Sequence, residues 1–227
     1  MKEQIAHGSM IVLTTFIVSA IIMIFMKKIA VHVGALDVPT NKEGHRHIHK
    51  KVMPKLGGVG IFLAFLVGYM LFGEQSLRMN SILIGSFIII LTGITDDIKP
   101  IRACQKLIGH IIAACVIVFY GKILLNNISV FGLTFDFGIW AYPITLFFIV
   151  ACTNIINLID GLDGLSGGIC SIFFATIAFI ALYQGRYNSL VLILSLITIG
   201  APAKIPTFSP FALFVSISFA CSIAISK

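Results

Sequence analysis

The sequence predicts an all-α protein, a polytopic bundle of about seven or eight transmembrane helices, and three observations support this fold class. Of the 227 residues, 58% are hydrophobic and only 11% are charged. The mean hydropathy is +1.05. Soluble domains carry about 25% charged residues, and a globule of this size has too little interior to bury so many apolar side chains. The composition therefore excludes a soluble enzyme, a disordered chain and a coiled coil.

The third observation is a series of apolar runs along the whole chain. They fall at about 10–26, 56–73, 81–95, 106–120, 138–156, 165–183, 189–201 and 207–225. A spanning helix needs about 20 residues, with a range of about 17–25. The first, second, fifth, sixth and eighth runs fit this length, and we expect the third and fourth to continue into their polar ends. The seventh run is the weakest match.

Charge predicts how the spans are oriented. The chain has 16 Lys and Arg against 9 Asp and Glu, a net charge of +7. If the loops alternate sides, most basic residues fall on one side: Lys27, Lys28, Lys42, Arg46, Lys50, Lys51, Lys55, Lys99, Arg102, Lys106 and Lys204. Basic loops stay in the cytoplasm, which puts the N-terminus outside. We therefore expect the positive charge to set membrane orientation and not to bind nucleic acid.

One segment on the outer side has a different pattern. Residues 128–136 (ISVFGLTFD) place a turn-like Gly132 between two arms rich in β-forming residues, which predicts a short external β-hairpin.

Two adjacent carboxylates, Asp96 and Asp97, close the third run in the segment GITDDIKP. Like charges at a membrane boundary repel each other and lose hydration, so they persist most easily beside a cation or a bound proton. A solvated helix end with Lys99 and Arg102 nearby explains the pair equally well.

A second polar cluster, NIINLIDGLDGL, closes the fifth run at residues 154–165. On a helix, Asn157 and Asp160 are three residues apart and share a face. Their oxygens, with those of Asp163, suit Mg²⁺, which takes one or two carboxylates and completes its shell with phosphate and water. The alternative is a glycine turn in which Asp163 caps the next helix, and this leaves the other acid and the amides unexplained.

A basic loop follows the first run at residues 27–58 and contains the closely spaced histidines His45, His47 and His49. Its cations are suited to anionic lipid head groups or to a nucleotide diphosphate. A loop that only sets orientation explains the charge, but not the turn PKLGG at 54–58. Because both acidic clusters and this loop are predicted to meet one membrane face, we expect a Mg²⁺–diphosphate site at the lipid–water boundary. Phosphoryl transfer needs chiefly positioning and charge neutralisation, which such a cluster provides.

At these residues the sequence resembles the polyprenyl-phosphate N-acetylhexosamine-1-phosphate transferases, glycosyltransferase family 4. Three motifs match in order between about residues 27 and 170. They are D-x-P…H-x-x-x-x-P-x-x-G-G from Asp37 to Gly58, G-x-x-D-D…K from Gly93 to Lys106, and N-x-x-N-x-x-D-G-L-D-G-L. The MPKLGG ending of the first motif is closer to the GlcNAc branch than to the muramoyl-pentapeptide branch.

The resemblance implies a reaction and its setting. UDP-N-acetylhexosamine, most closely UDP-GlcNAc, would react with undecaprenyl phosphate in the presence of Mg²⁺ to give a lipid-linked diphosphosugar and UMP. This would initiate a cell-envelope polysaccharide such as teichoic acid. The protein would be a multi-pass protein of the bacterial plasma membrane, with its active site facing the cytoplasm, and it would be expected to form a homodimer.

The resemblance also implies residue roles. Asp96 and Asp97 would be the catalytic pair, acting as a base on the lipid phosphate or positioning it. The metal ligands would be Asp97 and Asp160. The remaining substrate-binding residues would be Arg46, His49, Lys106, Asn157, Asp160 and Asp163.

The match weakens after residue 205. Residues 202–205 (PAKI) resemble the start of a family stretch P-A-K-I-F-M-G-D-x-G-S, but PTFS follows at 206–209. The later aspartate, which the family is thought to use for Mg²⁺, is absent. We therefore expect a C-terminally truncated member, with an incomplete transferase domain at 1–205 and an atypical hydrophobic tail at 206–227. Two alternatives remain open: a catalytically inactive remnant of the family and an ion-coupled membrane transporter.

Overall fold

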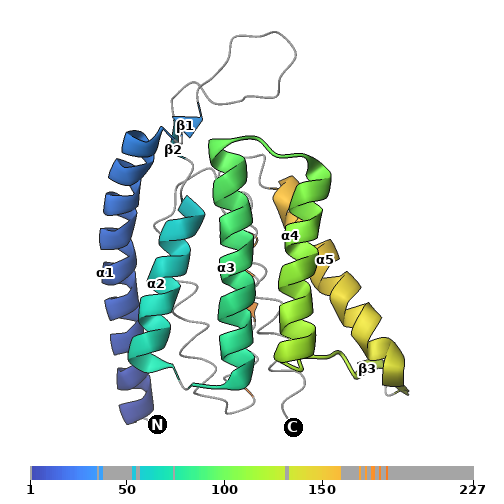
Figure 1. Cartoon of the computed structure of the whole chain (residues 1–227). Helices are drawn as coiled ribbons and strands as arrows, with labels where there is room; N and C mark the ends of the chain where they lie inside the picture. Colours follow the sequence, from blue (N-terminus) through green and yellow to red (C-terminus); the bar gives the residue numbers. More distant parts are fainter. Residues whose placement is uncertain are drawn as a thin grey trace.

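The computed structural model describes residues 2–34, 36–37, 53–54, 57–73, 75–130 and 133–159, together with single helical residues at 169, 172, 175, 176, 179 and 183. Five α-helices form most of this part of the chain: α1 (Lys2–Val33), α2 (Gly57–Phe72), α3 (Leu77–Ile98), α4 (Ala103–Cys115) and α5 (Ala141–Ile159). Figure 1 shows them side by side with roughly parallel axes, as expected for a helical bundle.

Four of these helical segments are long and apolar enough to cross a membrane: Phe16–Val33, Leu77–Asp96, Ala103–Tyr120 and Gly138–Ile155. The helix of the second run is shorter, with an apolar part at Gly57–Leu71. The third and fourth runs do extend into polar residues, since α3 ends at Ile98 and α4 begins at Ala103. The predicted helical membrane fold is therefore confirmed, with helices at the first five runs, although the helix of the second run is shorter than the spanning length that the sequence predicted. The total number of spans and the domain boundary at residue 205 lie outside the described residues.

Large side chains that are almost wholly buried come from α2, α3, α5 and the end of α4. Phe65 comes from α2, Ile82 and Ile89 from α3, and Ile149 from α5. Ile117 joins them from η1 (Val116–Tyr120), the π-helical turn that continues α4. Many other apolar side chains point outward, among them Phe16 on α1 and Phe147 on α5. An apolar exterior is expected where lipid replaces water around the helices.

Local sequence explains where α3 begins and ends. The Ser76 hydroxyl accepts a hydrogen bond from the Met79 backbone N–H at 3.1 Å, which caps the first turn. At the other end the Lys99 N–H donates to the Thr95 carbonyl at 2.9 Å. Pro100 follows, and proline disfavours helical geometry in the residue before it. The chain therefore turns at this point and starts α4 three residues later.

Two glycines let α4 and its π-helical continuation approach α3 closely. A Cβ added at Gly109 would overlap the Thr92 side chain, and one added at Gly121 would overlap the Ser81 side chain. Thr92 and Ser81 lie near opposite ends of α3, so the helices are in close contact along most of their length. This contact fixes the direction in which α4 leaves the turn.

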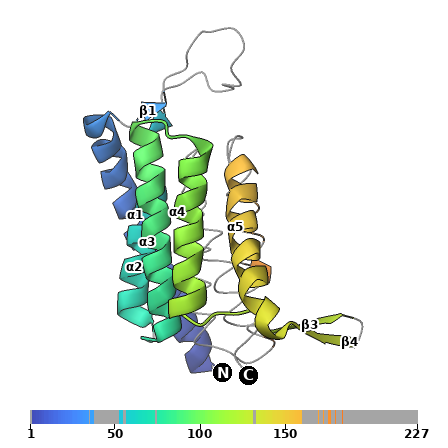
Figure 2. The same ribbon diagram turned by 45° about the vertical axis from the view of Figure 1, so that its right-hand side comes forward.

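Two short antiparallel sheets lie at opposite ends of the bundle (Figures 1 and 2). At one end, β1 (Leu36–Asp37) pairs with β2 (Met53–Pro54), which the sequence analysis did not predict. At the other, β3 (Asn127–Val130) and β4 (Leu133–Asp136) form the predicted hairpin. A single 3-10 turn, η2 (Gly138–Trp140), joins this hairpin to α5.

Candidate functional site

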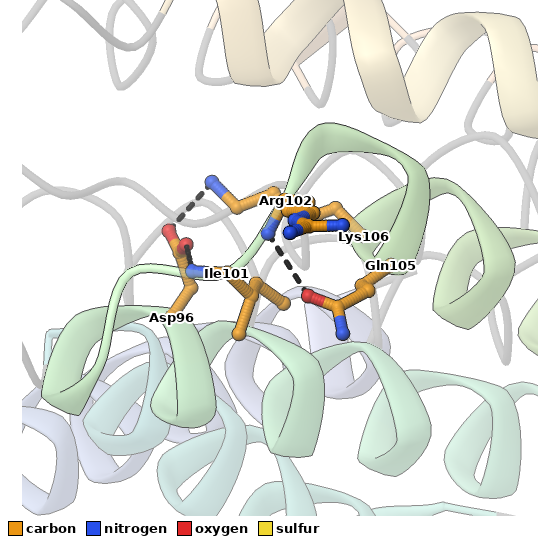
Figure 3. Close-up of polar contacts among 5 residues, drawn as sticks. All are labelled: Asp96, Ile101, Arg102, Gln105 and Lys106. Carbon is orange, nitrogen blue, oxygen red and sulfur yellow. Dashed lines mark hydrogen bonds and ion pairs between the residues drawn. The ribbon is translucent and has the colours of Figure 1, made fainter.

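An ion pair stands at the turn between α3 and α4. The Lys106 ammonium lies 2.5 Å from Oδ2 of Asp96, and both side chains are partly exposed, at 28% and 24%. Oδ1 of Asp96 accepts a hydrogen bond from the Ile101 backbone N–H at 3.1 Å. Figure 3 shows that the one carboxylate thus contacts both the connecting turn and the first part of α4. Asp96 therefore stabilises the turn between α3 and α4 and orients the Lys106 side chain beside it.

The first turn of α4 is organised by Gln105. Its side-chain oxygen accepts a hydrogen bond from the Arg102 N–H at 3.0 Å, while its own N–H donates to the Arg102 carbonyl at 2.9 Å (Figure 3). A side chain at this position commonly satisfies a backbone donor at a helix start in the same way. Because this first turn is fixed, the backbone of the next residue, Lys106, is held in a defined position from which its side chain extends.

The basic side chains at this turn are suited to bind an anion. Lys106 is held beside a carboxylate at the edge of an apolar bundle, with the exposed Arg102 and Lys99 on the same turn. A phosphate oxygen arriving there would compete with Asp96 for the Lys106 ammonium, since both form charge-assisted hydrogen bonds. The turn is therefore suited to receive and release a phosphate group.

The β1–β2 pair lies at the same end of the bundle as this turn, and so does the C-terminal end of α5 (Figures 1 and 2). Leu36 pairs with Pro54 and Asp37 with Met53, which brings together the two ends of the segment 38–52. The described ends of the first motif, the backbone of the paired aspartates and the start of the third motif thus share one end of the molecule. We call it the Asp96 end.

The remaining predicted site residues are described in part or not at all. Asp97 lies in the last turn of α3 and Asn157 near the end of α5, and the structure describes only their backbones. Arg46, His49, Asp160 and Asp163 lie outside the described residues. Of the predicted set, the structure therefore brings together Asp96 and Lys106.

Two polar residues lie where α4 packs on α5: His110, which the sequence analysis did not select, and Asn154, the first residue of the third motif. His110 is only 3% exposed, and its Nδ1 has no hydrogen-bond partner in the described part of the chain. Asn154 on α5 is close enough to hydrogen-bond the imidazole, and its own side-chain NH₂ donates to the Val150 carbonyl at 2.8 Å. His110 follows Lys106 by four residues on α4, so its polar contact lies one turn deeper in the bundle than the ion pair.

No group of three His, Cys, Asp or Glu side chains comes together within the described ranges. Asp96 is the only predicted carboxylate whose side chain is described there, and both of its oxygens already have partners within the chain. The donor type still fits Mg²⁺, because hard cations prefer carboxylate oxygens. The other carboxylates proposed for the metal, those of Asp97 and Asp160, are not among the described side chains.

Comparison with known proteins places these motifs in a family. The model of glycosyl transferase family 4 matches residues 79–216, which is more than half of the chain. This chain belongs to glycosyl transferase family 4. The match includes α3, α4, the hairpin and α5, and therefore the Asp96–Lys106 pair. It also runs past residue 205, where the sequence analysis places the end of the transferase domain, and that boundary stays a prediction.

Individual family 4 relatives agree with this assignment. The chain is 40% identical over 197 residues to a probable undecaprenyl-phosphate N-acetylglucosaminyl 1-phosphate transferase of Bacillus subtilis, a match that covers 84% of this chain and 53% of the relative. It is 36% identical over 172 residues to a phospho-N-acetylmuramoyl-pentapeptide-transferase of Bacillus licheniformis, covering 68% and 52%. A third relative, an undecaprenyl-phosphate alpha-N-acetylglucosaminyl 1-phosphate transferase of Salmonella typhi, is 26% identical over 176 residues, covering 77% and 47%.

The coverage of these family 4 relatives is itself informative. The chain spans about half the length of the curated relatives that it matches. The match therefore shows that the chain belongs to the family, and the activity of the whole protein is a proposal.

Proposed function

We propose that this protein is a phosphoglycosyl transferase that moves N-acetylhexosamine 1-phosphate, specifically GlcNAc-1-phosphate, from a UDP-sugar to undecaprenyl phosphate. An oxygen of the lipid phosphate attacks the phosphorus attached to the sugar. The new diphosphate bond forms as the bond to the uridylate phosphate breaks, and UMP leaves. The product is a lipid-linked diphosphosugar that begins a cell-envelope polysaccharide.

One observation carries this proposal: Lys106 and Asp96 form an ion pair, inside the region matched by the family, at the boundary of an apolar helical bundle. A lipid with a phosphate head and a long apolar tail needs a cationic group at this depth, with an apolar surface below it. The names of the relatives support the choice of undecaprenyl phosphate and GlcNAc, since two of the three carry both.

The chain's own residues have assigned roles in this proposal. Lys106 binds phosphate oxygens, and Asp96 holds Lys106 in place. Asp96 and Asp97 are the catalytic pair, acting as a base on the lipid phosphate or positioning it. Arg46 and His49 bind the diphosphate, as cations of the loop whose ends meet at β1 and β2. Asn157, Asp160 and Asp163 bind the nucleotide and the metal-bound part of the diphosphate.

Mg²⁺ completes the proposed site, with Asp97 and Asp160 as its protein ligands. When bound, it neutralises charge on the diphosphate. The site opens on the cytoplasmic face in this proposal, because Lys99, Arg102 and Lys106 lie at the Asp96 end and the two ends of the basic segment 38–52 meet there. A homodimer in the bacterial plasma membrane is part of the same proposal.

A membrane assay tests the proposal. Membranes containing the full chain are incubated with radiolabelled UDP-GlcNAc and undecaprenyl phosphate, with Mg²⁺ or with a chelator. We expect labelled lipid and UMP only with Mg²⁺, and loss of both in the Asp97→Asn variant. Asp136→Asn is the matched control, because it makes the same chemical change on the hairpin at the opposite end of the bundle.

Three outcomes separate the proposal from its alternatives. A normal rate in Asp97→Asn would contradict the assigned roles. Binding of UDP-GlcNAc without turnover would favour an inactive family remnant. Movement of a solute across vesicles with no chemical change would favour a transporter.

A further inference from the structure

The β3–β4 hairpin has two chemically different faces. Its register pairs Phe135 with Ile128 and Leu133 with Val130, whereas Thr134 pairs with Ser129 and Asp136 with Asn127. Alternate residues of a strand face opposite sides, and directly paired residues share a side. The pairing therefore joins apolar residues to apolar residues and polar residues to polar ones along the whole hairpin.

In the part of the chain that the structure describes, both apolar residues of β4 are exposed. Leu133 is 65% exposed and Phe135 is 56% exposed. An isolated two-stranded hairpin is at best marginally stable in water, and it gains stability when an apolar face is buried. The exposed apolar face would therefore be stabilised by contact with lipid or with another protein surface.

The hairpin is fixed at its base and points away from the bundle. The Phe137 N–H donates to the Asn126 carbonyl at 2.8 Å, which closes the base. Just before it, the Leu125 N–H donates to the Thr145 hydroxyl on α5 at 2.8 Å. Figure 2 shows the two strands extending sideways from the bundle, across the direction of the helices, at the level where α5 begins. If the helices cross a membrane, the hairpin lies along its surface.

Aromatic residues lie at the same level. Trp140, which is 66% exposed, directly precedes α5, and Tyr142 stacks on Phe119 with ring centroids 5.8 Å apart. Tyr120 is exposed beside Phe119 at the end of η1. Trp and Tyr gather at the boundary between acyl chains and water, because their rings are apolar and their N–H or O–H group is polar. This level therefore matches the interface of a bilayer.

We propose that the β3–β4 hairpin is a membrane-binding element that lies in the interface of the leaflet at this end of the bundle. Its apolar side, with Leu133 and Phe135, rests on the acyl chains, and its polar side, with Thr134 and Asp136, faces water. Phe147 on α5 is also exposed, as expected for a helix that faces lipid. The occupant is a lipid surface, and the inference does not depend on the proposed function.

The chain contains a single tryptophan, which makes a direct test practical. Trp140→Phe removes it, and Phe135→Trp or Thr134→Trp in that background places one reporter on either side of the same strand. The full chain is reconstituted in vesicles of phosphatidylcholine and phosphatidylglycerol, with or without dibrominated phosphatidylcholine. Emission is measured against lipid bromine and against aqueous acrylamide.

We expect the reporter at 135 to be quenched several-fold more by brominated lipid than the reporter at 134, and to emit at shorter wavelength. The reporter at 134 is expected to be quenched several-fold more by acrylamide. Equal access of acrylamide to both positions would overturn the proposal. Protection of position 135 from both quenchers would also overturn it, because a second copy or another protein segment would then cover the face. If Phe135→Trp fails to give helical circular dichroism, Leu133→Trp supplies the reporter on the same side.

Discussion

The carboxylate of Asp96 joins two backbone elements, because one oxygen accepts the Ile101 N–H and the other contacts the Lys106 ammonium 2.5 Å away. The two interactions differ in kind. The first is a neutral donor within the turn, and the second is a charge pair with α4. Removing the negative charge and removing the acceptor oxygens should therefore have separable effects.

The Asp96 side chain is the first test of this separation. Asp96→Asn keeps an acceptor for the Ile101 N–H, whereas Asp96→Ala removes it. We expect Asp96→Ala to lower the free energy of unfolding by about 1 kcal/mol more than Asp96→Asn, the net value of one hydrogen bond. Thermal unfolding in detergent, followed by circular dichroism, measures the difference. Equal stability of the two variants would show that the turn does not depend on this acceptor.

Lys106 is expected to matter for catalysis more than for stability. A partly exposed ion pair contributes at most about 1 kcal/mol, so Lys106→Met should change the free energy of unfolding by less than that. In the proposed reaction the same change removes a cation from the phosphate, which should lower the rate about 10²–10³-fold. UMP release from membranes measures the rate. Lys122→Met, at the opposite end of the bundle, should leave it unchanged, and an unchanged rate in Lys106→Met would argue against phosphate binding by Lys106.

Gly109→Ala should weaken the contact between α3 and α4. The added Cβ would overlap Thr92, and such overpacking costs about 1–3 kcal/mol. Gly93→Ala on α3 is the matched control, because a Cβ there meets nothing within 4 Å. The control should be neutral or slightly stabilising, since alanine favours helix. Adding Thr92→Ala to Gly109→Ala should recover stability, and strict additivity of the two changes would contradict the contact.

Thr145 should be more important than Thr153, although both are buried threonines on α5. Each hydroxyl donates to the carbonyl four residues earlier, at 2.6 Å and 2.7 Å. Thr145 also accepts the Leu125 N–H, so Thr145→Val leaves that donor without its partner. We expect a loss of about 1–3 kcal/mol for Thr145→Val and a smaller loss for Thr153→Val. Thermal unfolding of the two variants under the same conditions measures the difference in stability. Similar losses would show that the hydrogen bond to Leu125 contributes little.

The sequence predicted the first five helices and placed Asp96 and Lys106 near the turn between the third and fourth runs, because both inferences depend on local signals. Asp96 and Lys106 stand in one motif, and Pro100 between them indicates the turn. Their direct contact could not be predicted, since it depends on α4 folding back against α3 at Gly109. The hairpin was predicted from its β-forming arms around Gly132, while its register followed only from the structure.

Two other features gave no usable sequence signal. The β1–β2 pair has two residues in each strand, too few to show a periodic pattern. His110 is a single polar residue within an apolar run, and its significance comes from Asn154, which is distant in the chain and adjacent only after α4 packs on α5. Its spacing of four residues from Lys106 was the available hint.

The close contacts at Gly109 and Gly121 have a mechanical consequence. Two helices in contact at two separated points can neither rotate against each other nor slide without breaking one of the contacts. We therefore expect α3 and α4 to move together. Any separation of α4 from a neighbouring helix is therefore expected on its other flank, along its seam with α5. There His110 and Asn154 lie on the facing helices, and a contact between two polar side chains parts and re-forms more readily than the Thr92 and Ser81 side chains packed on glycine.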